Sequence, residues 1–316
     1  MREESTAHFD LIKIQNKRIV RNLLRAESPQ GISSLSKSSG LSNPTVAALL
    51  KELVMSNEVL VTAELESCGG RPGTRYELNA SYQYGCVMKF KDWFLEARVY
   101  DYAGKLVWKT KKPVTMEVGV EDILFLVEGI KAEYNTLSVI AIGVPGAVNQ
   151  SEITYLPKFP KLQGDVLAKQ LKATFSIDVL IENDMNATVY AQATEHSDFA
   201  HIAYMNGCIG VGIVQGKEVI KGSRGYAGEL EYLCDELSNQ VLTFAQCILA
   251  LVCVLDLPEV ILSGEACFHE TIPLVREQLE KRLPKERIPR IELVRELDTL
   301  YEEGLRKRII TKWLED

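Results

Sequence analysis

Asn183 and Asp184 place an amide next to a carboxylate at the end of a short apolar run, Val179 to Ile181. The following stretch has the composition of a helix, so the pair lies where a predicted strand turns into a helix. Open α/β sheets bind ligands at such strand ends. With a second carboxylate from another part of the chain, the pair could hold neighbouring hydroxyl groups through charge-assisted hydrogen bonds. The alternative is that Asp184 only caps the helix.

A second group of residues has the types and spacing expected of a DNA-binding surface. A short helix is predicted over Ser33–Ser39, and Gly40 and Leu41 form a tight turn after it. Ser42 can cap a second helix that carries Pro44 in its first turn, where proline costs least. Spacings of i, i+3, i+4 and i+7 give this second helix one buried face, formed by Val46, Leu49, Leu50 and Leu53.

The segment after these helices predicts a β-hairpin wing. Two short runs of strand character, Val59–Val61 and Arg75–Leu78, flank the glycine-rich segment 69–73. Helix, turn, helix and wing together are typical of a winged helix-turn-helix domain that binds double-stranded DNA, the alternative being a plain helical packing module. The residues expected to contact bases or phosphates are Ser42, Asn43, Thr45, Lys51, Arg71 and Arg75.

The distribution of charge indicates that a single copy of this domain would bind DNA weakly. Residues 1–80 contain ten Lys and Arg against nine Asp and Glu, and the whole chain carries −7, so the remaining residues carry −8. We call residues 1–80 the reader. Because phosphate neutralisation supplies much of the affinity for DNA, a nearly neutral reader would depend on dimerisation, and we expect a homodimer or tetramer.

The rest of the 316-residue chain predicts an α/β body. A first helix is expected over Lys13–Arg25 and a turn over Glu27–Gly31, and the body begins with three antiparallel strands between residues 85 and 114. Helices and buried strands then alternate, ending in a helix over Asp298–Leu314 that either returns to the first lobe or serves a dimer. The apolar segment Val241–Leu255 is short for a membrane span and is expected to be a core helix.

Seven cysteines without metal-ligand spacing, and an N-terminus without an apolar signal core, favour a cytoplasmic protein with reduced thiols.

The motifs GGRP, IAIGVPGAV, IENDMNA, RGYAGEL and PEVILSGEA, in this order, resemble those of the ROK family of bacterial repressors and sugar kinases. The resemblance implies a winged helix-turn-helix over residues 1–80 and a two-lobed, actin-like or hexokinase-like body, with lobes at 81–195 and 196–316. It further implies that Asn183, Asp184 and Glu229 bind sugar hydroxyls, Asp184 being the general base of the family's kinases.

The chain departs from the family pattern at three places. The kinase phosphate loop falls on residues 89–93, where Lys89 replaces a carboxylate and the glycines are lost, so phosphoryl transfer is not expected. The histidine of the zinc motif corresponds to Tyr232 and the cysteine cluster is absent, so neither a structural zinc nor another cofactor is expected. The asparagine of a third motif corresponds to Lys161, and Lys161 with Lys89 and Lys91 could face the cleft and favour an anionic sugar derivative.

The sequence therefore predicts a DNA-binding regulator, in particular a repressor of carbohydrate-utilisation genes. Its partners would be operator DNA and a carbohydrate or sugar-phosphate effector bound by Asn183, Asp184, Glu229, Tyr232 and Lys161. No association with a membrane is expected. The alternatives are an ATP-dependent sugar kinase that carries a reader, and a regulator that has lost its sugar effector.

Overall fold

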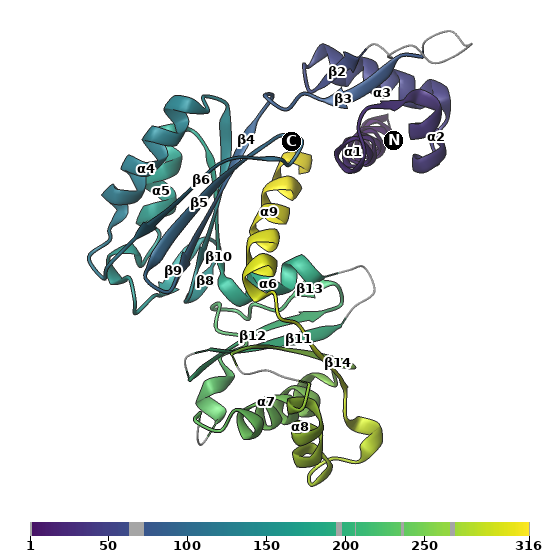
Figure 1. The fold of residues 1–316 in the computed structure, drawn as a ribbon. Helices are drawn as coiled ribbons and strands as arrows, with labels where there is room; N and C mark the ends of the chain where they lie inside the picture. Colours follow the sequence, from purple (N-terminus) through teal and green to yellow (C-terminus); the bar gives the residue numbers. More distant parts are fainter. Residues whose placement is uncertain are drawn as a thin grey trace.

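The computed structural model describes residues 2–62, 73–193, 198–205, 207–234, 237–265 and 269–315, with the side chains of residues 2–10 excepted. The chain is arranged as an N-terminal reader and two α/β lobes, and the last helix runs beside the first-lobe sheet from the second lobe towards the reader (Figure 1).

The reader is a helical unit closed by a small antiparallel sheet of order β1-β3-β2. Its elements are α1 (Arg2–Ala26), β1 (Gln30–Gly31), α2 (Ile32–Ser39), α3 (Asn43–Met55), β2 (Val59–Thr62) and β3 (Arg75–Leu78). The two helices and the paired strands of the predicted winged helix-turn-helix are all present. The predicted turn at Glu27–Gly31 is wrong at its end, because Gln30 and Gly31 pair with Tyr76 and Arg75 as a third strand.

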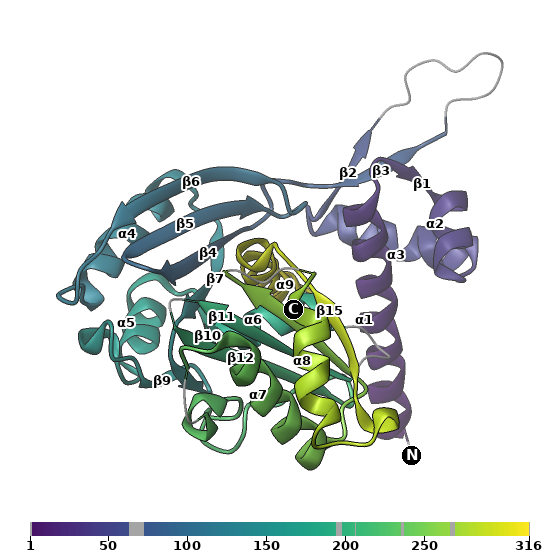
Figure 2. The same ribbon diagram turned by 60° about the horizontal axis from the view of Figure 1, so that its bottom comes forward.

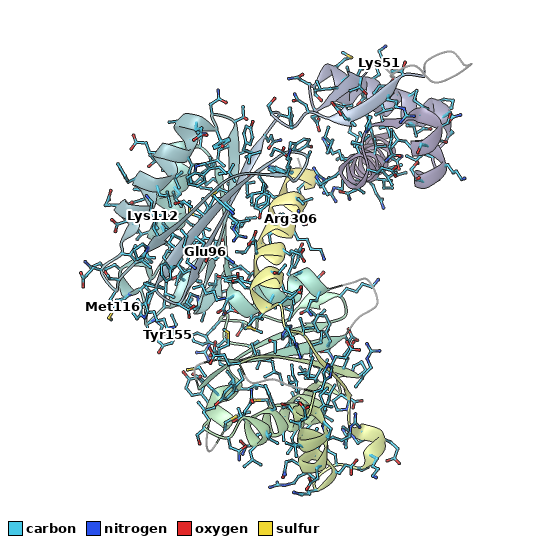
Figure 3. All side chains as sticks on the ribbon, viewed as in Figure 1. Lys51, Glu96, Lys112, Met116, Tyr155 and Arg306 are labelled. Atoms are coloured by element: carbon cyan, nitrogen blue, oxygen red, sulfur yellow. The ribbon has the colours of Figure 1, made fainter. Side chains whose placement is uncertain are left out.

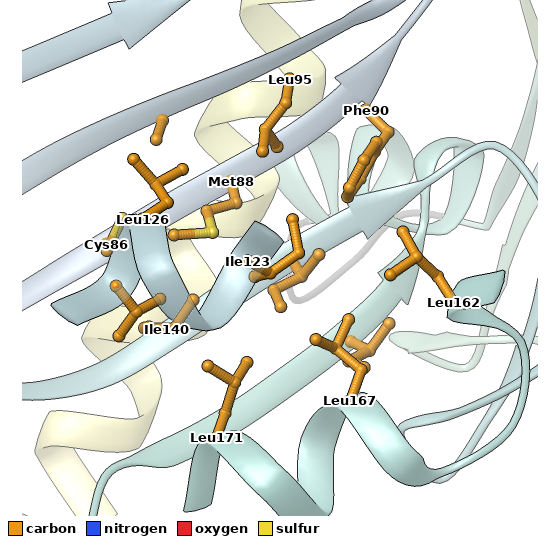
Figure 4. Packing of buried hydrophobic residues seen from close by; sticks show 14 of the residues in the cluster. Cys86, Met88, Phe90, Leu95, Ile123, Leu126, Ile140, Leu162, Leu167 and Leu171 are labelled. Atoms are coloured by element: carbon orange, nitrogen blue, oxygen red, sulfur yellow. The ribbon is translucent and has the colours of Figure 1, made fainter. Parts of the chain in front are cut away.

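The first lobe is a mixed sheet of order β10-β7-β4-β5-β6, in which β4, β5 and β6 form the predicted antiparallel meander and β7 and β10 run parallel. Helices α4 and α5 cover one face, where aliphatic side chains fill the core (Figure 4). The elements are β4 (Tyr84–Lys91), β5 (Phe94–Asp101), β6 (Leu106–Pro113), α4 (Val120–Glu133), β7 (Leu137–Val144), β8 (Ala147–Asn149), β9 (Glu152–Tyr155), η1 (Pro160–Leu162), α5 (Val166–Phe175) and β10 (Asp178–Asn183).

The second lobe has its own five-stranded sheet of order β13-β12-β11-β14-β15, with α7 and α8 packed on one side. The segment predicted as a core helix is α7, whose Phe244, Ile248 and Val252 are buried, and no described helix is long and apolar enough to cross a membrane. Helix α6 (Asp184–Gln192) begins at the end of β10 and connects the two lobes. The elements of the second lobe are β11 (Phe199–Met205), β12 (Cys208–Gln215), β13 (Glu218–Val219), η2 (Leu230–Leu233), α7 (Gln240–Leu255), β14 (Glu259–Gly264), α8 (Thr271–Glu280), η3 (Lys285–Arg287) and β15 (Arg290–Leu293).

Helix α9 (Leu297–Glu315) leaves the second lobe and lies across the face of the first-lobe sheet opposite α4 and α5. Close approach is possible because glycines stand beneath it: a Cβ added at Gly85 would lie 2.5 Å from Ile309. At Gly304 of α9 itself, an added Cβ would lie 1.7 Å from the carbonyl oxygen of Ala187 in α6. Figure 2 shows α1 as a long helix at one side of the molecule, with the strands of the wing sheet above it.

One hydrophobic cluster joins α9 to the reader. It contains Leu24, Leu50 and Leu53 of the reader, and Leu305 and Trp313 of α9. The reader is therefore packed on the body through α9 and does not hang from a bare linker.

Candidate functional site

The start of α3 is the exposed end of the reader. Ser42 is its N-cap, with Oγ accepting the Thr45 amide at 3.3 Å and lying 2.8 Å from Thr45 Oγ1. Asn43 is exposed, and Lys51, also exposed, follows two turns later on α3. Since the Ser42 hydroxyl is used by the cap, Asn43 and the amides of the first turn are the groups best placed to meet DNA.

The structure describes one of the two arginines predicted in the wing, Arg75. Arg75 is exposed at the start of β3, opposite Thr62 of β2 and Gly31 of β1. Arg71 lies outside the described residues. The structure therefore brings Arg75 to the edge of the same small unit that carries Ser42, Asn43, Thr45 and Lys51.

The predicted hydroxyl-binding pair lies where β10 ends and α6 begins. The Asn183 side chain accepts the amide of Asn186 at 2.9 Å and donates to the carbonyl of Gly146 at 3.0 Å. Asn183, not Asp184, is therefore the helix N-cap, and the capping alternative for Asp184 is wrong. Asp184 accepts the amide of Met185 at 2.8 Å on Oδ1, and Oδ2 forms no hydrogen bond with the described residues.

The carboxyl groups of Asp184, at the β10–α6 junction, and Glu229, in the second lobe, both have raised pKa values. Burial raises the pKa of Asp184 to about 6, and the negative charge of Glu229 adds to the rise, while Lys158 opposes it. Burial also raises the pKa of Glu229, with the charge of Glu231 adding to it. Both carboxylates are partly desolvated, and carboxylate oxygens in such surroundings are suited to accepting hydrogen bonds from a polyhydroxyl ligand.

Tyr232 and Lys161 lie further out. Tyr232 is 74% exposed, and partial desolvation, followed by the charges of Tyr155, Glu231 and Glu229, raises its pKa. Tyr155 marks the edge of the first lobe nearest the second (Figure 3). Lys161 forms an ion pair with Glu117 at 2.5 Å, and no bond links it to Asn183 or Asp184 among the described residues. Of the predicted ligand residues, Asn183 and Asp184 lie together at the β10–α6 junction, Glu229 influences Asp184 through its charge, Tyr232 is exposed, and Lys161 is paired with Glu117.

Lys89 does not face a cleft, contrary to the expectation that it would attract an anion. It is 1% exposed, and its Nζ lies 2.9 Å from Asp298, 3.4 Å from Glu96 and 3.6 Å from Glu302. Lys91 shares the same oxygen of Asp298 at 3.1 Å. Because three carboxylates already surround Lys89, its charge is not available to a ligand.

Lys89 belongs to a row of residues that crosses four strands on the α9 face of the sheet. Strand register places Glu96 and Gly143 on either side of Lys89, and Glu182 beside Gly143. Tyr301 of α9 covers the middle of the row, since a Cβ added at Gly143 would lie 2.2 Å from its hydroxyl. The space above this part of β4 is thus filled by a tyrosine and an ion-pair network.

These contacts were missed at the sequence level because their partners are far apart in the chain. Lys89 and Asp298 are separated by 209 residues. The buried Glu182 is likewise held by Lys221, from the other lobe. No local periodicity or spacing signals such pairs.

No group of three or more His, Cys, Asp and Glu side chains within the described ranges could hold a metal ion.

Fold and site together define a two-lobed, hexokinase-like α/β body that carries an N-terminal winged helix-turn-helix. The ROK family matches residues 95–233, and the chain carries a ROK family domain.

Among proteins of known name, the chain is 27% identical over 245 residues to the putative xylose repressor of Caldicellulosiruptor sp. (strain Rt8B.4), covering 73% of this chain and 61% of that protein. It is 22% identical over 234 residues to the xylose repressor of Bacillus subtilis (strain 168), covering 70% of this chain and 60% of that protein. The chain thus spans about 60% of the length of these relatives.

Solved structures share the fold. A ROK family transcriptional regulator, described as a homolog of the E. coli MLC protein, superposes with a TM-score of 0.70 at 17% identity, over 96% of this chain and 100% of that one. The ROK hexokinase from Thermus thermophilus superposes with a TM-score of 0.56 at 20% identity, over 74% of this chain and 99% of that one. The regulator covers the reader as well as the body, whereas the hexokinase matches about three quarters of the chain.

Proposed function

We propose that this protein is a sugar-responsive transcriptional repressor that binds operator DNA through its reader. The observation that carries the proposal is the reader itself: a capped α3 with an exposed start, next to a three-stranded wing sheet, packed on a hexokinase-like body. Such a helix presents its first residues to the major groove, while a wing contacts the backbone or the minor groove. The repressor names of the relatives agree with this proposal.

We further infer that the body does not transfer phosphoryl groups. Catalysis of that reaction depends on metal ions and backbone donors placed around the phosphates. In their place stand the buried Lys89, paired with Asp298, and the Tyr301 ring over Gly143. A nucleotide phosphate would have to displace a desolvated ion-pair network.

The effector would bind between Asn183, Asp184 and Glu229. Carboxylate and amide oxygens spaced across two lobes suit vicinal hydroxyls, and xylose is the first candidate because relatives are named xylose repressors. Because Asp184 and Glu229 come from different lobes, a ligand that bonds to both would favour lobe closure.

Closure can be transmitted to the reader through helices. Asp184 is the first residue of α6, and α6 crosses α9 where Gly304 meets Ala187. Helix α9 then reaches the reader, where Leu314 accepts a hydrogen bond from Arg18 at 2.6 Å. In a homodimer, a shift of α9 would alter the spacing of two readers and thus their fit to two half-sites. Linkage requires that DNA weaken sugar binding by the same factor by which sugar weakens DNA binding.

Selection of bound genomic fragments, followed by fluorescence anisotropy on the selected duplex, tests the proposal. We expect Asn43→Ala to cost about 1–3 kcal/mol of binding free energy and to relax sequence preference, and xylose to release the duplex. Glu128→Gln, at an exposed position of α4 in the first lobe, is the control variant and should leave affinity unchanged. Failure to select any fragment at low ionic strength would refute a DNA-binding function.

A coupled assay with ATP, magnesium and a sugar panel tests the loss of catalysis separately. Sustained ADP formation that depends on a sugar would refute it, whatever the DNA result.

A further inference from the structure

A groove of about 540 Å³ lies where the reader meets the body, well away from Asp184 and Glu229. Its walls come from three elements: the end of α1, the turn between β5 and β6, and the middle of α9. The volume is in the range of small-molecule sites in proteins.

Three cations from three different elements line this groove: Arg25 of α1, Lys105 of the β5–β6 turn and Arg306 of α9. No carboxylate in the described part of the chain lies within ion-pair distance of any of them. In the first lobe, by contrast, an ion pair with a carboxylate is formed by Lys89, Lys91, Arg98 and Lys111. The carboxylate of the turn, Asp101, is buried and accepts the Lys105 amide at 2.8 Å.

The two arginines are already oriented by the protein. Arg25 donates from Nε and Nη2 to the carbonyl of Tyr102 at 3.3 and 3.2 Å. Arg306 donates from Nη1 to the carbonyl of Gly104 at 3.4 Å, and its guanidinium stands 5.8 Å from the centre of the Tyr100 ring. Side chains held in this way lose little further freedom when they bind an anion, and guanidinium groups match the geometry of phosphate oxygens.

We propose that this groove binds the phosphate group of a small phosphorylated metabolite. The three cations form no ion pair with a described carboxylate, and a phosphate dianion would give them charge-assisted hydrogen bonds. Ala26, Ala103 and Ile310 give the groove an apolar side for the carbon portion of the ligand. Because Arg25 belongs to the reader and Arg306 to α9, the bound anion stabilises the reader in its docked position. The site is independent of the sugar site proposed above.

The test measures inorganic phosphate binding by isothermal titration calorimetry, with ionic strength held constant by chloride. We expect one saturable site in the full chain. Arg306→Gln and Lys105→Gln should each weaken binding about 10-fold or more, because each removes a charged hydrogen-bond donor to the anion. Arg25 is left unchanged because it also bonds to Tyr102.

Lys112→Gln is the control, since this exposed lysine of β6 stands away from α9 and Arg306 (Figure 3). It should bind phosphate as the unaltered protein does, and all three variants should keep their circular dichroism and melting temperature in chloride. Absence of saturable binding, or equal affinity in Arg306→Gln, would overturn the proposal.

Phosphate diesters of DNA offer the same chemistry, so the titration is repeated in the presence of the selected duplex. If phosphate binds equally well or better to the DNA complex, the groove holds a metabolite, as proposed. If phosphate competes with the duplex, and Arg306→Gln and Lys105→Gln weaken DNA binding as much as phosphate binding, the groove is a DNA contact and the proposal is overturned.

Discussion

Glu58→Gln tests whether a buried charge holds the reader together and to the body. Both ion-pairing nitrogens of Arg21 meet Glu58 Oε2, Nε at 2.8 Å and Nη2 at 2.7 Å. The same oxygen accepts the hydroxyl of Tyr102, from the first lobe, at 3.2 Å, and Oε1 accepts Ser56 Oγ at 2.9 Å. Burial raises the pKa of Tyr102 to about 12, so its phenol remains a donor.

The substitution removes charge with little change in shape. Glutamine can turn its carbonyl oxygen towards Arg21 and Tyr102 and its amide towards Ser56, whose hydroxyl can accept. What is lost is compensation for a buried guanidinium, and removing one partner of a buried pair costs about 3–5 kcal/mol. For a unit the size of the reader, each kcal/mol lowers the melting temperature by about 4–8 °C, so we expect a fall of at least about 12 °C.

Differential scanning calorimetry on the full chain, with far-UV circular dichroism, measures the effect. Glu52→Gln is the control, because Glu52 also meets two cations, Lys13 at 2.7 Å and Lys17 at 3.0 Å, but is 39% exposed. An exposed pair contributes at most about 1 kcal/mol. If Glu58→Gln lowers stability by no more than Glu52→Gln does, the buried pair does not hold the reader and the reasoning is refuted.

Three further predictions concern the body, each followed by urea unfolding. Lys89→Met leaves three carboxylates with less compensation and should cost about 3 kcal/mol, so a loss under 1 kcal/mol would contradict the inferred network. Because burial, then the charge of Glu229, raise the pKa of Asp184 to about 6 from 3.8, the native state binds the extra proton and stability falls as pH rises from about 4 to 6. Asp184→Asn should flatten the dependence of the free energy of unfolding on pH between about 4 and 6. Parallel pH profiles for the variant and the unaltered protein would contradict the raised pKa of Asp184. Gly304→Ala sets a Cβ 1.7 Å from the Ala187 carbonyl, so we expect a loss of about 1–3 kcal/mol and a weaker effect of sugar on DNA binding; unchanged stability would show that α6 and α9 separate freely.

Local signals were sufficient to predict the reader. The cap at Ser42, the proline in the first turn and the apolar spacing from Val46 to Leu53 are short-range features, and each predicts a conformation that the chain adopts. Strand β1 was missed because Gln30 and Gly31 become a strand only by pairing with Tyr76 and Arg75, more than 40 residues later.

In the body, too, some features were predictable from local sequence and others depended on the tertiary structure. Alternating and continuous apolar runs indicated β4, β5, β6 and β7, because side-chain burial follows strand periodicity. The position of Asn183 and Asp184 at the end of a strand was also readable, but which of the two caps α6 depended on the backbone geometry of the turn. The approach of Glu229 to Asp184 required both lobes to be folded.

By itself the sequence determined the winged reader, the α/β body and the strand end that carries the candidate sugar residues, since all of these rest on contacts within a few residues or on simple periodicity. Only the tertiary structure decided the surroundings of Lys89: the sequence allowed it to face a cleft, whereas the fold buries it among carboxylates of β5 and α9. The same holds for the junction of Arg21, Glu58 and Tyr102, and for the groove of Arg25, Lys105 and Arg306. The physical reason is that the free energy of a charge depends on which partners surround it and how much water they exclude, and those partners come from distant parts of the chain.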